Sequence, residues 1–465
     1  MELDFVVEKI KSKLNVDKSF DIVGRDIFIG DKKGYFVFVD GFAKDDVLYY
    51  LLENIQKAKP FSNLGDFLAK EIAYIESEIV KDDNEYDKLV LSVLCGMFAL
   101  VIDGYDEYIL IDSRQYPMRS VTESEVEKVI RGAKDSFVET IVFNTALIRR
   151  RIRSEKLIFE MEQIGEYSKT DIAISYIDGL VDEKVLEEVK SRIKSINTKA
   201  VILGAEYIED LLFKKKWYNP LPLVKYTERP DVAAAYLSEG HILLIIDTCP
   251  VGIVLPITIL QFAQHIGDYN VKFINGTIAK IMRFVAIISS VIFIPIFIYL
   301  AENTKVFEEL SKKGDTPEEM LFSFSVQIII LEIAFLSLQM SSLHIPTQIA
   351  PLFAIVGGLL LSDVAIKLGI VNPITLIAMA ITVINTYSIP SIEFSDAIRI
   401  FRFFMILMTG FFGIVGLLIS LIIVIGITYS TEVVKGAKKY TYPIVPFNFN
   451  DLKSLLFREN AKDMK

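Results

Sequence analysis

The pattern of hydrophobic and polar residues differs between the two halves of the chain. Up to about residue 260, apolar runs are short and charged residues separate them, whereas 284–301 and 403–431 contain no charged residue. Two further apolar stretches, 320–340 and 349–390, lie between these runs. An apolar run of about 18 residues or more can cross the hydrocarbon core of a membrane as a helix. The pattern predicts a soluble N-terminal half followed by a helical transmembrane bundle.

One unit of the N-terminal half occurs twice. Residues 35–39 have the pattern of a strand, an Asp-Gly turn follows, and apolar positions at helical spacing occupy 47–55. The same order recurs at 172–193, and the two Asp-Gly pairs stand 138 residues apart. Residues 97–111 and 241–255 form a second pair, each with the pattern of a β-hairpin. The repeat predicts two related α/β subdomains; a chance match of a common pattern is the alternative.

These patterns divide the chain into five parts. We expect an α/β subdomain at 1–118, linking helices at 119–167, a second α/β subdomain at 168–265, a transmembrane domain of four to five segments at 266–431 and a cytoplasmic tail at 432–465. A capping box at Thr122–Glu125 precedes apolar residues at helical spacing, which continue to Ile152. The linking region is therefore expected to be helical.

The end of this linking region is basic. It holds four arginines, Arg149, Arg150, Arg151 and Arg153. Clustered arginines bind anionic lipid head groups or the carboxylates of a partner, so one interpretation is a coupling or lipid-facing surface. The other interpretation places them at a helix C-terminus, paired with glutamates within 155–162.

Charged residues around the apolar runs predict the orientation in the membrane. Lysines and an arginine within 272–283 precede the first run, the loop 302–319 is mostly acidic, and the C-terminal tail is basic. By the positive-inside rule, the N-terminal half and the tail face the cytoplasm, which needs an even number of crossings. We count five apolar segments, at 279–301, 320–341, 349–369, 373–390 and 403–430. One segment within 344–390, where proline and glycine interrupt, is therefore expected not to cross.

A few polar residues lie within these apolar segments. Glu332 is near the middle of its segment, where a lone carboxylate is costly unless it is paired, protonated or hydrated. Gln327 and Gln339 flank it, and Gln339 lies on the same helix face as Glu332. Asp363 and Asn385 add polar groups to the later segments. These residues are candidates for the lining of an ion or solute path; hydrogen bonding between helices is the alternative.

Two other segments have features of membrane anchors. The predicted loop 393–402 carries Arg399 and Arg402 directly before the last apolar run. The stretch 214–220 combines lysines with Trp217 and a tyrosine, as residues at a membrane–water interface do. A solvated turn is the alternative for this second stretch.

Composition and motifs argue against several other classes of protein. The 465 residues are 52% hydrophobic and 24% charged, with a net charge of −10. A nucleic-acid partner needs a basic surface, which this charge argues against. The sequence holds no phosphate-binding loop or dinucleotide motif, and its two cysteines and three histidines have no metal-ligand spacing. We therefore expect no enzymatic activity, no cofactor, no metal and no nucleic acid.

Several motifs together resemble one known family. Residues 119–140 and Asn144–Ile152 form a series that is similar to a signature of the GerA family of spore germination proteins, which includes the A-type subunits of germinant receptors. Residues 226–240 are similar to a second block of that family, and stretches at 355–373 and 388–403 are similar to its membrane blocks. The resemblance covers nearly the whole chain.

The resemblance implies a multi-pass protein of the spore inner membrane whose large N-terminal region faces the spore core. It implies an oligomeric ion channel that releases monovalent cations and amplifies germination. The expected partners are membrane lipid, further copies of the chain and other spore germination membrane proteins. The alternatives are an A subunit of a nutrient germinant receptor and a non-conducting scaffold for germination proteins.

Overall fold

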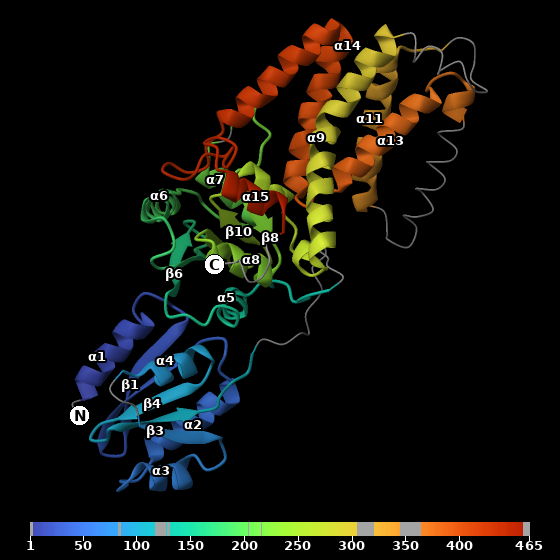
Figure 1. Ribbon diagram of the computed structural model, residues 1–465. Helices are drawn as coiled ribbons and strands as arrows, with labels where there is room; N and C mark the ends of the chain where they lie inside the picture. The colour runs from blue at the N-terminus through green and yellow to red at the C-terminus, as the bar shows by residue number, and fades with distance from the viewer. Residues whose placement is uncertain are drawn as a thin grey trace. The chain divides into compact units, whose positions relative to one another are not determined.

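The structure of the chain is a computed structural model that describes residues 3–81, 85–116, 127, 131–202, 204–214, 216–304, 320–344 and 364–458 (Figure 1). The chain divides into two units. The α/β unit consists of Met1–Lys215, Leu223–Ile257 and Val433–Lys438, and it holds both β-sheets. The helical unit consists of Lys216–Pro222, Thr258–Glu432 and Lys439–Lys465, and it holds the long apolar helices.

The first sheet of the α/β unit follows the predicted strand pattern. Its elements are α1 (Leu3–Leu14), β1 (Ile22–Ile29), β2 (Lys32–Val39), α2 (Asp45–Lys57), α3 (Leu64–Glu71), β3 (Ser77–Lys81), α4 (Asp87–Leu94), β4 (Phe98–Ile102) and β5 (Glu107–Ile111). The strands are antiparallel, in the order β1-β2-β4-β5-β3. Helices α1 and α4 pack on one face, and α2 and α3 on the other. Because both faces are covered, β4 is buried at every position, which explains its unbroken apolar run.

The second sheet repeats this arrangement. Its elements are α5 (Ile141–Arg149), β6 (Leu157–Ile164), β7 (Thr170–Ile177), α6 (Glu183–Lys194), α7 (Ala205–Leu212), β8 (Lys225–Thr227), α8 (Pro230–Ser238), β9 (Ile242–Ile246) and β10 (Gly252–Leu255). The strand order β6-β7-β9-β10-β8 matches that of the first sheet position by position. Strands β2 and β7 end at Val39 and Ile177, in agreement with the spacing of the Asp-Gly turns. The prediction of two related α/β subdomains is confirmed.

The linking region differs from the helical expectation. Only α5 is helical between residues 131 and 152, and the predicted capping box at 122–125 lies outside the described residues. Residues 131–140 have no regular secondary structure, and the Phe137 N–H donates to Glu228 O instead of to a helical neighbour (2.7 Å). Strand β6 lies within the range 119–167, so the second sheet begins there. The domain boundaries stay predictions.

In the part of the helical unit that the structure describes, four helices are long and the others are short. These are the 3₁₀ helices η1 (Ile259–Ala263) and η2 (Ile266–Tyr269), and the α-helices α9 (Phe273–Asn303), α11 (Phe324–His344), α13 (Pro373–Tyr387), α14 (Ile392–Tyr429) and α15 (Phe449–Leu456). By length and composition, α9 and α14 are apolar enough to cross a membrane, and α11 and α13 are shorter apolar helices. Most of the predicted segment 349–369 lies outside the described residues.

Helix α14 folds back on itself near its middle. Gly413 has φ 59° and ψ −138°. This conformation is not helical, and residues other than glycine rarely adopt it. Three residues later, a Cβ on Gly416 would lie 1.9 Å from Met408 O, an approach that a straight helix does not allow. Figure 1 shows the two arms meeting at an apex. The apolar run 403–430, predicted as one segment, is therefore divided between two arms, 392–412 and 414–429.

Candidate functional site

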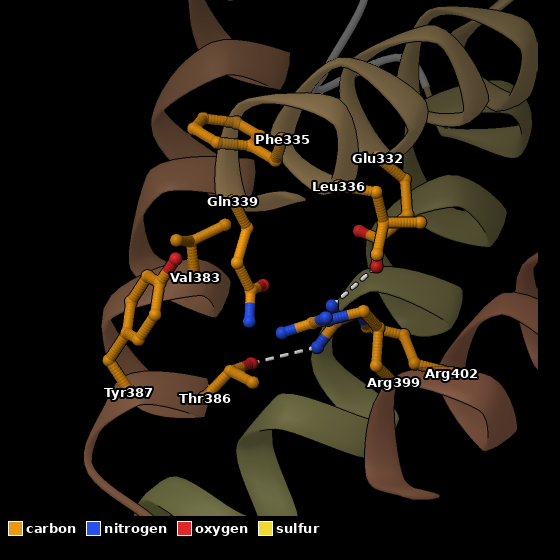
Figure 2. A pocket seen from close by; sticks show the side chains of 9 residues that line it. All are labelled: Glu332, Phe335, Leu336, Gln339, Val383, Thr386, Tyr387, Arg399 and Arg402. Atoms are coloured by element: carbon orange, nitrogen blue, oxygen red, sulfur yellow. Dashed lines mark hydrogen bonds and ion pairs between the residues drawn. The ribbon is translucent and has the colours of Figure 1, made fainter. Parts of the chain in front are cut away.

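Arg402 lies at the centre of a polar cluster within the helical unit. Its Nη2 donates to Glu332 Oε1 of α11 at 2.5 Å, and its Nη1 donates to Thr386 Oγ1 of α13 at 2.8 Å (Figure 2). The same Nη1 donates to Ser290 O of α9 at 3.3 Å. Because Arg402 itself belongs to α14, one guanidinium joins all four long helices that the structure describes in this unit.

Both charges of the cluster are removed from water. The side chains of Arg402 and Glu332 are 2% and 1% exposed. An unpaired buried charge costs several kcal/mol, so each of these groups depends on the other. The pairing is nevertheless incomplete, because Glu332 Oε2 and Arg402 Nε have no hydrogen-bond partner among the residues that the structure describes. A pair with an unused acceptor and an unused donor can adopt another hydrogen-bonding arrangement.

A small cavity adjoins the ion pair. Its volume of about 20 Å³ has room for about one water molecule. Besides the pair, its lining residues are Phe335, Leu336, Gln339, Val383, Thr386, Tyr387 and Arg399 (Figure 2). Gln339 thus lies on the same side of α11 as Glu332, as their spacing predicts. The Arg399 guanidinium also pairs with Asp396, at 3.2 Å. The cavity therefore offers the charges of the ion pair and of Arg399 together with neutral hydrogen-bonding groups.

Two of the candidate path residues make hydrogen bonds between helices. Gln327 is buried, and its Oε1 accepts from the Asn372 N–H (2.9 Å) and the Thr375 hydroxyl (3.1 Å) at the start of α13. Asn385 Nδ2 of α13 donates to Ser289 Oγ of α9 at 3.0 Å. These contacts match the alternative interpretation of the polar residues, in which they hold helices together.

Asp363, the remaining candidate, lies outside the described residues, so the structure places four of the five predicted path residues. It brings Glu332 and Gln339 to one cavity and leaves Gln327 and Asn385 at separate helix contacts. Within the described parts of the chain, no group of three or more His, Cys, Asp or Glu residues is arranged to hold a metal ion.

Arg402 is the site residue that the sequence-based interpretation assigned wrongly. Residues 393–402 were expected to form a loop with a cytoplasmic anchor, but α14 begins at Ile392, where the Ser391 hydroxyl accepts from the Phe394 N–H. Arg402 is buried because Glu332 neutralises it. The sequence did contain a signal for this pair: Glu332 lies within an apolar run and Arg402 lies directly beside one.

The arginines of the linking region have separate roles in the α/β unit. Arg149 is fully buried and forms a bidentate pair with Asp21, from Nε to Oδ2 at 2.8 Å and from Nη2 to Oδ1 at 3.0 Å. It also donates to Ser154 O and Leu157 O, at 2.9 and 3.0 Å. Its burial excludes a lipid-facing position for this residue. Because Asp21 directly precedes the first strand of the first sheet and Leu157 begins the second sheet, the pair joins the two subdomains.

The three neighbouring arginines are less buried than Arg149. Arg151 pairs with Asp135 at 2.6 Å, and the Arg150 guanidinium lies over the Tyr116 ring at 4.7 Å. Arg153 is exposed, and its Nη1 is 3.5 Å from Cys95 Sγ. Each of the four arginines therefore takes a different partner.

Comparison with known proteins identifies the family. The model of a family described as Bacillus/Clostridium GerA spore germination protein matches residues 8–465. The chain belongs to the GerA family. Its resemblance to this family, drawn from short motifs, is therefore confirmed over nearly its whole length.

Individual GerA relatives agree with this assignment. Stage V sporulation protein AF of Bacillus subtilis (strain 168) is 32% identical over 97% of this chain and 91% of its own length. Stretches such as Ile111–Pro117 also resemble that protein. The membrane protein YfkQ of the same organism is 29% identical over 94% of this chain and 85% of its own length. A crystal structure of the N-terminal domain of the A subunit of the Bacillus megaterium spore germinant receptor GerK3 matches with a TM-score of 0.41 and 25% identity, over 55% of this chain and 94% of that domain.

Proposed function

We propose that this GerA protein is a multi-pass protein of the spore inner membrane that assembles into a homo-oligomer and conducts monovalent cations during germination. In this proposal the α/β unit faces the cytoplasm, which is the spore core. Its partners are membrane lipid, further copies of the chain and other germination proteins. The released cations would amplify germination.

The buried pair of Glu332 and Arg402 carries this proposal. Charged residues among apolar helices are costly in a membrane, and they commonly mark the routes of ions or protons. Arg402 contacts α9, α11 and α13 at once, so separating it from Glu332 would change the contacts of every long helix described in the unit. We infer that the pair belongs to a closed arrangement and that it rearranges before ions pass.

The candidate path residues have different parts in this proposal. Gln339 borders the cavity beside Glu332 and remains a candidate for the lining of the path. Gln327 and Asn385 support the bundle through their hydrogen bonds between helices. Asp363 remains a candidate from the sequence alone. Arg149 couples the two subdomains of the α/β unit, and this coupling is proposed as the role of the basic segment.

Cation release from liposomes tests the proposed conduction. The purified full-length chain should release monovalent cations, and Glu332→Gln should change the rate by about tenfold or more, which corresponds to about 1.4 kcal/mol in the barrier. The direction of the change distinguishes two roles: an increase means that the pair closes the path, and a decrease means that the carboxylate attracts the cation.

Glu432→Gln is the matched control, since Glu432 is an exposed carboxylate of the same unit. This variant should leave the rate of release unchanged. Well-folded oligomers of the wild-type chain that release no cations would overturn the proposed conduction.

A non-conducting scaffold is the second candidate function. The observation that favours it is that Gln327, Asn385 and Glu332 all have hydrogen-bond partners within the chain itself, as residues that stabilise a bundle do. A scaffold predicts that Glu332→Gln leaves spore germination intact as long as the protein accumulates. Germination that fails in spores with normal amounts of the variant contradicts this second function.

A further inference from the structure

The turn at Lys216–Pro222 belongs to the helical unit and exposes a large aromatic side chain. Trp217, the single tryptophan of the chain, is 97% exposed, and the neighbouring Tyr218 is 45% exposed. The turn itself is ordered by hydrogen bonds, because the Asn219 N–H donates to Lys216 O (2.9 Å) and Asn219 Oδ1 accepts from the Leu221 N–H (3.2 Å). A fixed turn that points an indole outward calls for an explanation, since burial of so much apolar surface is normally favourable.

Two contacts attach this turn to residues that follow α14 in the chain. Asn219 Nδ2 donates to Thr431 Oγ1 at 3.0 Å, two residues beyond the last residue of the helix. The Tyr440 hydroxyl donates to Pro222 O at 3.1 Å. The turn therefore has a defined place beside the C-terminal end of the second arm of α14, although more than 200 residues separate them in sequence.

The second arm of α14 has the properties of a lipid-facing helix that ends at this point. Between residues 414 and 429 a helix is about 24 Å long, close to the hydrocarbon thickness of about 30 Å. Its exposed side chains are almost all apolar, among them Val415, Leu418, Ile422 and Ile425, which are 52–69% exposed. The arm ends at Tyr429, which is 53% exposed, and Lys439 Nζ lies 5.0 Å from the centre of its ring. Apolar surface thus gives way to aromatic and basic groups at one end of the arm.

We propose that Trp217, Tyr218 and Tyr429, with Lys216 and Lys439, form an anchor in the head-group region of the membrane. Indole and phenol rings prefer this region because one end of each ring is apolar and the other forms hydrogen bonds. The two lysines supply positive charge for lipid phosphates. Through the Asn219–Thr431 hydrogen bond, the anchor fixes the depth at which the second arm of α14 leaves the membrane. This inference rests on the membrane insertion within the proposed function.

The single tryptophan allows a direct test in the full-length protein. The chain is reconstituted in vesicles of phosphatidylcholine and phosphatidylglycerol, with phosphatidylcholine brominated either near the head group or deep in the acyl chains. The Trp217 emission should shift to shorter wavelength than in the urea-unfolded chain. It should lose more intensity with the shallow bromines than with the deep ones, and little with iodide in the buffer.

Other patterns of quenching overturn the anchor. Quenching by iodide without quenching by brominated lipid means a solvated turn. Protection from both quenchers means that protein, such as a second copy of the chain, covers the tryptophan. Asn219→Ala removes the contact with Thr431, so it should reduce the difference between shallow and deep bromines. An unchanged difference contradicts the role of that hydrogen bond in setting the depth.

Cation release from the same vesicles separates this inference from the proposed function. An interfacial Trp217 in vesicles that release no cations leaves the anchor intact and overturns conduction. Cation release with a water-exposed or protein-covered Trp217 overturns the anchor alone.

Discussion

Arg149 of the α/β unit and Arg402 of the helical unit are both buried, but they are paired in different ways. Arg149 of the α/β unit binds both oxygens of Asp21, two backbone carbonyl groups and the Ser19 hydroxyl. Arg402 of the helical unit binds one oxygen of Glu332, the Thr386 hydroxyl and the Ser290 carbonyl group, but its Nε and the second Glu332 oxygen are without partners in the described structure. The first pair is saturated with hydrogen bonds, and the second is not.

This difference indicates what each pair can do. A bidentate pair whose remaining donors bind backbone carbonyl groups has one favourable geometry, so it holds two subdomains in a fixed relation. A pair held through one oxygen can move to its free atoms with a smaller loss of hydrogen bonds. We therefore expect substitutions of Arg149 to act on folding, and substitutions at the Glu332–Arg402 pair that keep both charges to act mainly on function.

The largest expected effect is that of Arg149→Met on stability. This change leaves the Asp21 carboxylate buried without its counter-charge, which costs about 3–5 kcal/mol. In thermal unfolding of the full-length chain in detergent, the midpoint for the α/β unit should therefore be clearly lower than in the wild-type chain. Arg153→Met, at an exposed arginine four residues away, is the control and should change the midpoint little. Similar midpoints for the two variants would contradict the assigned role of the Asp21 pair.

The sequence predicts much of the fold because burial determines the pattern. The apolar run of β4 and its counterpart β9 follow from helices on both faces of each sheet, and the Asp-Gly turns mark where the strands end. The Gly413 bend could not be predicted, since glycine is common in apolar helices and its backbone angles leave no mark in composition.

The candidate site was predicted only in part, for a similar reason. Glu332 is conspicuous because it interrupts an apolar run, whereas Arg402 stands beside one and resembles an ordinary flanking charge. Arg149 looked like part of a basic surface because its partner, Asp21, lies 128 residues earlier in the chain. Such pairs depend on tertiary structure, which spacing along the sequence does not encode.

The α/β unit also holds a histidine, His241, whose side chain is 13% exposed and which differs from both arginines because it is neutral. Burial lowers its pKa to about 4; the hydrogen bond to Pro256 O opposes this effect, and the charges of Lys438 and Lys225 add to it. Nδ1 lies 2.6 Å from Pro256 O, and a carbonyl only accepts, so Nδ1 carries the hydrogen. In the unfolded chain the pKa returns to about 6.5.

Acid should therefore destabilise the α/β unit through His241. Between pH 6.5 and 4 the unfolded state binds a proton that the folded state does not, so stability is complete above this range and falls as the pH decreases. The loss reaches about 3 kcal/mol. His241→Phe keeps an aromatic ring against Tyr236 and removes the titration. Unfolding measured from pH 7 to 4 should lose much of its pH dependence in this variant; an unchanged dependence would assign acid sensitivity to other groups.

The smallest effect, and the most direct comparison of the two pairs, comes from lysine substitutions. Lysine keeps the positive charge but cannot bind a carboxylate through two parallel N–H groups. Arg149 donates five hydrogen bonds, so Arg149→Lys loses the bidentate contact with Asp21 and contacts with backbone carbonyl groups. Arg402 donates only three, to Glu332, Thr386 and Ser290, and the three N–H donors of a lysine can match that number. Since one hydrogen bond contributes about 1 kcal/mol, Arg149→Lys should be the more destabilising variant by about that amount or more.

The two lysine variants are compared by thermal unfolding of the full-length chain in detergent and by cation release. Arg402→Lys should unfold near the wild-type midpoint while its rate of release changes, because the pair is weakened without leaving Glu332 uncompensated. Arg149→Lys should instead lower the unfolding midpoint and leave the rate of release unchanged. A midpoint of Arg402→Lys that is as low as that of Arg149→Lys, or lower, would contradict this difference between the pairs. The unused atoms of Glu332 and Arg402 would then provide no freedom to rearrange, and the pair in the helical unit would be as rigid as the one in the α/β unit.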